Sequence, residues 1–255
     1  MILLILMKFI PVTTRAFLPP RDDIYDLLDR SLPKLANGDV LVITSKVLAI
    51  HQGRCIKIEP SVKKDKLIER EADAYISRRR VPRQAAILTL KRHTLIPSSG
   101  IDESNGNGYY ILWPRKVNAL LKEIHAHLVR RHKVKRLALI ATDSHTTPLR
   151  YGVMGISVGF YGLAPLIDYR GKKDIFGRTL TMTQSNLVDT LAAMSVLLMG
   201  EGKERRPFLI IRGAKFIPFT RRDAWRELVI PKHIDLYAPL LKAFTRKNMK
   251  PPENH

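Results

Sequence analysis

The sequence is poor in cysteine and has no long hydrophobic run, and each shortage excludes a class of protein. Cys55 is the single cysteine among 255 residues, which rules out a disulfide framework within the chain and a multi-cysteine zinc site. A reducing, cytoplasmic location fits best. The hydrophobic run 1–7 is far shorter than the roughly 20 residues that cross a bilayer. It also lacks a basic start and a small-residue cleavage site, so we expect neither a signal peptide nor a membrane contact, but an edge strand, or Met7 as the true first residue.

Acidic residues are scarce as well. The chain has 23 Asp and Glu against 44 Lys and Arg, a formal net charge of +21, and such a charge is one mark of nucleic-acid binding. The basic groups at 78–80, 130–133 and 205–206 are short and scattered, and aromatic side chains are not interleaved with them as a base-stacking surface requires. We therefore favour a solvated basic surface that attracts polyanionic substrates, and keep a nucleic-acid-binding protein without catalytic activity as the alternative.

The apolar content of 45% is that of a globular protein, and its periodicity predicts an α+β fold of mixed sheets and packed helices. Apolar runs predict strands at 9–12, 39–43, 86–96, 109–113, 136–141 and 207–212. Helical spacing predicts a helix that begins after the capping pair Asp22-Asp23, and helices at 63–76, 117–132 and 185–199. The glycine-rich run 152–162 is β-like, and the domain divides into two lobes somewhere before the segment 135–213.

Three loops carry groups suited to chemistry, because the common phosphate-binding motifs, Walker A and GxGxxG, are both absent. The loops are 100–105, 142–145 and 199–202, and each joins a carboxylate to hydroxyl groups or glycines. Oxygen ligands of this kind suit Mg²⁺ or Mn²⁺. Taken singly, an Asp beside a Ser in a turn is more often a capping residue than a ligand.

Seven segments in their order and spacing are more specific than any single loop. They are GDVLVITSKV (38–47), QGR (52–54), GIDESN (100–105), TDS (142–144), DYRGKKDIFGR (168–178), LLMGEG (197–202) and IIRG (210–213). Together they resemble the coenzyme F420-0:L-glutamate ligase family, the γ-glutamyl ligases of deazaflavin biosynthesis. The resemblance implies that family's fold over 9–213 as an intertwined homodimer, between an N-terminal extension (1–8) and a C-terminal extension with a frayed tail (214–255).

The activity that the resemblance implies is formation of an amide between L-glutamate and a small carboxylate acceptor. GTP would phosphorylate the acceptor to an acyl phosphate, and the glutamate amine would then displace phosphate. Two Mg²⁺ or Mn²⁺ ions are implied, with K⁺ as a further ion, since cations neutralise charge on the transferred phosphoryl group. Coenzyme F420-0 and a folate-like compound are the two acceptors that we consider.

The family's functional positions carry over onto named residues of this chain. Asp102 and Asp143 match the catalytic positions that hold one metal ion, and Ser144 and Glu201 match those near the second. The implied nucleotide-binding residues are Thr13, Thr14, Arg15, Ala16, Ser45, Lys46, Asn105, Met199, Gly200, Glu201 and Gly202. Arg150 and Arg170 are the weaker candidates for binding the acidic substrate.

Two departures from the family's pattern leave the substrates open. Ile50 stands where many members have a lysine, so that Lys46 would supply the positive charge and the choice between GTP and ATP is not decided. Thr146-Thr147 replaces a Gly-Arg pair in a loop expected to face the acceptor. Neither the acceptor nor the number of glutamates added follows from the sequence.

Several other polar residues have a simpler interpretation beside the functional one. Arg170 and the pair Lys172-Lys173 are substrate ligands or only solvated loop charges, and Glu201 is a metal ligand or a residue at a helix end. We expect His145 to be a polar loop residue and Cys55 to be a small buried residue without an activated thiolate. The histidines of the helix 117–132 are expected on a solvated face: His125, His127 and His132.

Overall fold

The computed structural model of the protein describes residues 7–246. The expectations for the run before Met7 and for the tail 247–255 therefore lie outside the described residues. Within them, no helix is both long and apolar enough to cross a membrane. The α+β class expected from the periodicity is confirmed, with several separate sheets and helices packed on them.

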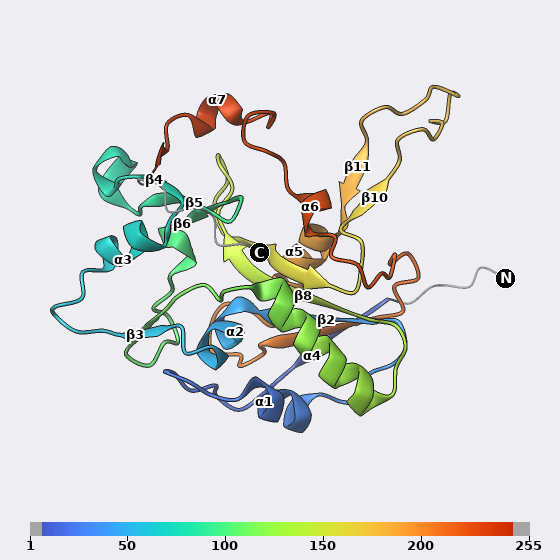
Figure 1. Cartoon of the computed structure of the whole chain (residues 1–255), viewed down its shortest axis with the longest axis horizontal. Coiled ribbons are helices and arrows are strands. Elements are labelled where there is room, and N and C mark those ends of the chain that lie inside the picture. Colours follow the sequence, from blue (N-terminus) through green and yellow to red (C-terminus); the bar gives the residue numbers. More distant parts are fainter. Residues whose placement is uncertain (1–6, 247–255) are drawn as a thin grey trace.

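A five-stranded sheet in the order β1-β12-β2-β8-β9 forms the centre of the molecule (Figure 1). Its strands are β1 (Lys8–Val12), β2 (Asp39–Thr44), β8 (Leu137–His145), β9 (Met154–Tyr161) and β12 (Phe208–Arg212). Only β2 and β8 pair in parallel, and the other neighbours are antiparallel. The inner strands read as continuous apolar runs, such as DVLVIT and FLIIR, because both of their faces are buried.

Helices cover both faces of this sheet, which makes three layers. On one face, Leu41 and Ile43 of β2 pack in a cluster with α1 (Ile24–Ser31), α2 (Ser45–His51) and α4 (Val117–His132). On the other face, Val40 and Val42 pack in a cluster with α5 (Leu187–Met199). The alternation of β2 side chains between the two clusters follows from the period of two in an extended strand.

A second, smaller group of elements lies between α2 and α4 in the sequence and has its own apolar cluster. Its antiparallel sheet has the order β13-β4-β5-β6, with β4 (Ala74–Ile76), β5 (Leu88–Lys91), β6 (Thr94–Pro97) and, from the C-terminal segment, β13 (Thr245–Arg246). The pair β3 (Cys55–Lys57) and β7 (Tyr109–Ile111), the helix α3 (Lys64–Glu71) and the short turns η1 (Arg78–Arg80), η2 (Pro82–Gln84) and η3 (Ser98–Gly100) complete it. We call residues 52–116 the small lobe.

The remaining elements form an arm and a C-terminal segment. The strands β10 (Leu166–Asp168) and β11 (Gln184–Asn186) start an arm that projects from the central sheet (Figure 1). After residue 213 the chain adds Ala214, Ile217 and Ala224 to the cluster beside α5. It then continues through α6 (Trp225–Leu228) and α7 (Ala238–Leu241) to reach β4 of the small lobe.

Three predicted elements differ from the observed ones because tertiary pairing decides their ends. The predicted helix 63–76 stops at Glu71, since the Asp73 amide already bonds Leu90 and 74–76 is the strand β4. The predicted strand 86–96 is the hairpin β5–β6, which turns at Arg92 and His93 with positive φ. The predicted strand 136–141 continues to His145, because β9 pairs with its extra residues.

The expectation of solvated histidines on α4 is wrong for two of the three. His125 and His132 are buried, at 7% and 6% exposure. Each lies four residues after a buried leucine, Leu121 or Leu128, and therefore on the same face of the helix. The His125 ring bonds the Leu137 carbonyl at 3.1 Å, and Nδ1 of His132 accepts the Leu35 amide at 3.2 Å. Burial lowers the pKa of both imidazoles. His127 lies nearer the surface and pairs with Asp29 at 2.8 Å.

An ion pair between β2 and β12 joins two of the segments that carry the family resemblance, 38–47 and 210–213. Asp39, at the start of β2, is 1% exposed, and its carboxylate accepts two hydrogen bonds from Arg212 at 2.9 and 2.7 Å. The amide of Ala36 donates a third at 2.7 Å. These hydrogen bonds compensate the cost of taking the carboxylate out of water. The charged residues in these two segments are therefore structural.

Replacing Arg212 by Met should destabilise the fold, because it leaves the Asp39 carboxylate buried with one partner fewer. We expect a loss of about 2 kcal/mol in the free energy of unfolding, less than for a fully buried pair, because 35% of the Arg212 side chain is exposed. Urea unfolding followed by circular dichroism measures it. Arg170→Met is the matched control, since its exposed pair with Asp168 contributes under about 1 kcal/mol. Equal stability of the two variants would contradict this assignment.

Candidate functional site

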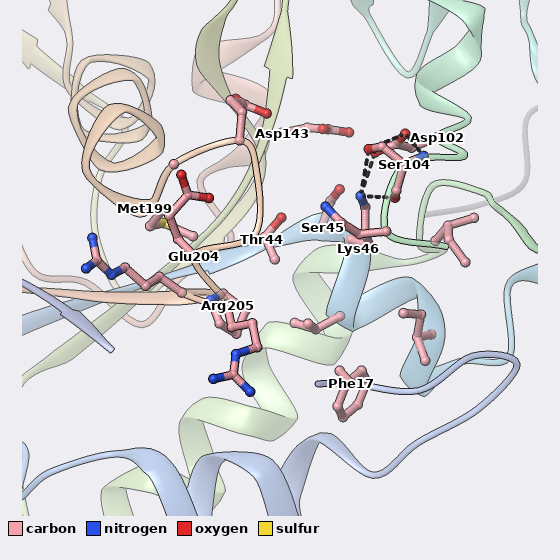
Figure 2. A pocket seen from close by; sticks show the side chains of 18 of the residues that line it. Phe17, Thr44, Ser45, Lys46, Asp102, Ser104, Asp143, Met199, Glu204 and Arg205 are labelled. Carbon is pink, nitrogen blue, oxygen red and sulfur yellow. Dashed lines mark hydrogen bonds and ion pairs between the residues drawn. The ribbon is translucent and has the colours of Figure 1, made fainter. Parts of the chain in front are cut away.

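A cavity of about 580 Å³ lies at the carboxyl ends of β2 and β8, the two parallel strands. Several separate segments line it: residues 14–17 after β1, the end of β2 with the first turns of α2, residues 100–112, the end of β8 (142–144), and residues 196–207. Figure 2 shows their side chains around one hollow. Thr44 and Thr142 are the last register partners of β2 with β8, so the next residues, Ser45 and Asp143, follow at the same edge.

Asp102 lies in the acidic loop that follows η3 and faces the start of α2. The Nζ atom of Lys46 is 2.6 Å from Oδ2 of Asp102 and also donates to the Ser104 carbonyl at 2.8 Å (Figure 2). The Ser104 amide and hydroxyl donate to the same carboxylate at 2.8 and 2.9 Å. Burial favours the protonated acid, but the Lys46 charge and these hydrogen bonds outweigh it and lower the pKa of Asp102. Asp102 is therefore a firmly ionised carboxylate.

Asp143 lies near the end of β8 and is half-buried. The indole N–H of Trp113 donates to its Oδ2, and the Ser144 amide donates to its Oδ1 at 2.8 Å. Burial is the main reason that the pKa of Asp143 rises to about 6, and the negative charge of Asp102 adds to it. The site thus holds two carboxylates whose negative charges repel each other. Keeping Asp143 ionised without a nearby cation costs free energy.

The third acidic segment is the loop after α5. The helix ends at Gly200, whose φ of 82° suits glycine, and a Cβ there would crowd the Glu204 carboxylate. Burial, together with the charges of Asp102 and Glu204, raises the pKa of Glu201. The Gly202 amide donates to Glu204 at 2.8 Å, and the Asn105 amide group donates to the Gly202 carbonyl at 3.1 Å. Asn105 therefore ties the acidic loop to this glycine-rich loop.

A family model described as F420-0:Gamma-glutamyl ligase matches residues 16–213. The chain belongs to this family. A coenzyme F420:L-glutamate ligase of Methanocaldococcus jannaschii is 31% identical over 216 residues, covering 80% of this chain and 86% of the relative. Similar enzymes of Methanopyrus kandleri and Methanosarcina mazei are 32% and 30% identical, covering 80% and 84% of this chain and 86% and 88% of the relatives. The F420-0:gamma-glutamyl ligase model thus spans most of the cavity's lining, and residues 214–255 lie beyond it.

Most of the residues expected in the site of a γ-glutamyl ligase line the one cavity. They are Thr14, Arg15, Ala16, Ser45, Lys46, Asp102, Asn105, Asp143, Ser144, Met199, Gly200, Glu201 and Gly202. Three expected residues do not line it. Thr13 precedes it with its side chain exposed, Arg150 is exposed in the β8–β9 loop, and Arg170 in the arm pairs with Asp168 at 2.6 Å. Ile50, where the resemblance led us to consider a lysine, does line the cavity.

Sequence reasoning missed several residues that shape this ligase-family site. Ser104, Glu204 and Arg205 line the cavity; Ser104 lies inside the matched segment 100–105, and the other two follow the matched segment 197–202, which was the available signal. Phe17 also lines it, next to the segment 13–16. Trp113 contacts Asp143 from the small lobe, and no local pattern indicated that contact.

Two residues outside the cavity were also considered for chemistry. Cys55 is half-buried, and burial raises the pKa of its thiol to about 11, so it is not an activated nucleophile. His145 is half-buried and belongs to β8, not to a loop as expected. It lines a second cavity of about 400 Å³ with Asp189 and Thr190.

The donor groups fit a hard divalent cation only when another molecule completes the coordination. Carboxylate and hydroxyl oxygens from Asp102, Asp143, Ser144 and Glu201 line the cavity, and such oxygens are what Mg²⁺ and Mn²⁺ prefer. Among residues 7–246, however, no three His, Cys, Asp or Glu side chains are grouped closely enough to hold a metal ion. Lys46 occupies the Oδ2 side of Asp102. Oxygens of a bound nucleotide would have to supply the missing ligands.

Proposed function

We propose that this protein is a divalent-metal-dependent γ-glutamyl ligase that uses a nucleoside triphosphate to join L-glutamate to a small carboxylate acceptor. Membership of the F420-0:gamma-glutamyl ligase family supports the reaction class. The observation that carries the proposal is the cavity itself, where Asp102, Asp143 and Glu201 arrive on three separate segments around Lys46. GTP is the proposed nucleotide, and coenzyme F420-0 or a folate-like compound the proposed acceptor.

The proposed reaction has two steps, and neither needs an oxidant or a reductant. An acceptor carboxylate oxygen attacks the γ-phosphorus, the bond to the β-phosphate oxygen breaks, and a nucleoside diphosphate leaves. The glutamate amine then attacks the acyl carbon of the acyl phosphate, phosphate leaves, and the amine loses a proton. The chain's own contribution is to hold the reacting groups in line and to exclude water, because phosphoryl transfer depends mainly on positioning and electrostatics.

The proposed roles of the acidic residues are those that the family resemblance implies. Asp102 and Asp143 would hold one cation, and Ser144 and Glu201 would hold the second. Such cations neutralise the charge on the phosphate oxygens when bound. Lys46 brings the positive charge nearest to Asp102, and its position at the start of α2 suits a contact with a phosphate oxygen. The Ser45 side chain lowers the pKa of Asp143 and so opposes part of the effect of burial.

The distribution of positive charge supports attraction of an anionic substrate rather than nucleic-acid binding. Arg205 and Arg206 line the cavity. Arg78 is paired with Asp65 at 2.8 Å, and Arg131 is paired with Asp29 at 2.9 Å. The three basic groups noted in the sequence therefore belong to separate elements, and the one at the cavity is placed to draw in phosphates and carboxylates.

The assay that tests the proposal measures phosphate release from GTP or ATP with L-glutamate and a panel of acceptors. We expect release with GTP only when glutamate and one acceptor are both present. Asp143→Asn should lower turnover at least about 100-fold, because it removes one carboxylate charge from the cation site with little change in volume. Asp235→Asn is the matched control, since Asp235 is half-buried like Asp143 but lies outside the cavity. Wild-type turnover in Asp143→Asn would refute the assignment.

Metal binding should depend on the nucleotide, because the protein supplies too few ligands by itself. In calorimetric titrations, Mn²⁺ alone should bind weakly, and two ions should bind in the presence of a non-hydrolysable GTP analogue. Two tight Mn²⁺ sites in the absence of nucleotide would be incompatible with the proposed site.

The proposal includes a homodimer in which the β10–β11 arm reaches the second subunit. Ile175, Phe176 and Met182 of the arm are 92%, 90% and 86% exposed, and the arm stands away from the rest of the chain (Figure 1). Apolar side chains exposed to this degree mark an interaction surface. Light scattering at micromolar concentration should give twice the chain mass, and Ile175→Ser with Phe176→Ser should give the monomer. A wild-type monomer would overturn this part.

A further inference from the structure

Trp113 connects the small lobe to the central sheet at the active-site cavity. It follows β7, its side chain is 3% exposed, and it belongs to the apolar cluster under α4. Its indole N–H donates to Oδ2 of Asp143, which lies on β8. Trp113 thus provides a direct hydrogen bond from the small lobe to a carboxylate of the central sheet.

The same indole also contacts the loop that carries the other carboxylate. Gly100 has a φ of +66°, and a Cβ at this position would overlap the Trp113 ring. Asp102 is two residues farther along the same loop, and its amide bonds the Ile111 carbonyl at 3.0 Å, just before Trp113. One side chain therefore touches both the Asp102 loop and the Asp143 carboxylate.

A buried cluster of charged side chains in the small lobe contacts Trp113. Nε of Arg54 donates to the Trp113 carbonyl at 3.1 Å, and Nζ of Lys91 lies 5.9 Å from the centre of the ring. Both cations share the Glu71 carboxylate, at 2.6 and 3.0 Å. Lys91 is 6% exposed, and buried pairs of this kind tolerate little movement because separation leaves an uncompensated charge. The small lobe thus holds the Trp113 backbone and places a cation near its ring, in addition to the apolar cluster under α4.

We propose that Trp113 is a positioning residue that sets the orientation of the Asp143 carboxylate relative to Asp102. The inference rests on the proposed function, in which both carboxylates hold a cation. Indole is a donor only, so it fixes Oδ2 without competing for a cation, while the Ser144 amide fixes Oδ1. Hydrogen bonds from such outer partners orient carboxylate ligands and tune their affinity for metal.

The test compares Trp113→Phe with Trp225→Phe, which replaces the only other tryptophan. Trp225 packs on Phe160 away from the cavity. Phe at 113 retains an aromatic ring but has no donor. We expect the affinity for Mn²⁺ in the presence of GTP analogue to fall about 10–100-fold, with kcat reduced by a similar factor and KM for glutamate unchanged. Trp225→Phe should retain both values.

A second replacement separates the lost donor from lost packing. In the Trp225→Phe background, benzothienylalanine at position 113 keeps the bicyclic shape of tryptophan but has sulfur in place of the N–H. It should show the same loss of Mn²⁺ affinity as Trp113→Phe, with an unchanged circular dichroism spectrum.

The outcomes distinguish this inference from the proposed function. Wild-type affinity for Mn²⁺ in the benzothienylalanine protein would overturn the positioning role, whether or not that protein is active. Because binding is measured without turnover, a wild-type protein that binds Mn²⁺ with the nucleotide analogue but forms no amide would contradict the ligase proposal alone. Loss of affinity in Trp225→Phe to the same extent would also overturn the role of Trp113.

Discussion

The parallel pairing of β2 with β8 is the constraint on which the site depends. Helices on both faces bury the two strands, so a shift of one residue would move every side chain of a strand into the packing on the opposite face. This register places Thr44 opposite Thr142. The start of α2 and the end of β8 consequently meet at one edge, and the loops after β1 and α5 close around them.

The chemistry of the cavity comes from charges that are only partly balanced. Asp102 is neutralised by Lys46, whereas Asp143 and Glu201 are desolvated and have raised pKa values. Burial of carboxylates without enough cations costs free energy. In the proposed function, a divalent ion bound with the phosphates of a nucleotide would offset that cost. The small lobe takes part in this balance, because it carries Asp102 directly and contacts Asp143 through Trp113.

Features that depend on a few neighbouring residues could be predicted from the sequence. The helix 117–132 has the predicted bounds, because its apolar spacing and the break at Pro114 are local. Asp23 caps α1 and Gly200 ends α5 for the same reason. The three acidic loops could be selected because carboxylates beside glycines or hydroxyls are visible in the sequence. That they line one cavity was expected only through the resemblance of their order and spacing to a known family.

What the sequence determined by itself was therefore the apolar periods, the caps, the excess of positive charge and the chemical groups available to the site. The tertiary structure alone decided where strands end, as in the extension of β8 by pairing with β9, and which polar groups are buried, as for His125 and His132. It also decided that Trp113 donates to Asp143, across 30 residues of chain. Contacts of this kind depend on how segments that are distant in the sequence pack together. A local pattern of residues cannot predict the free energy of that packing.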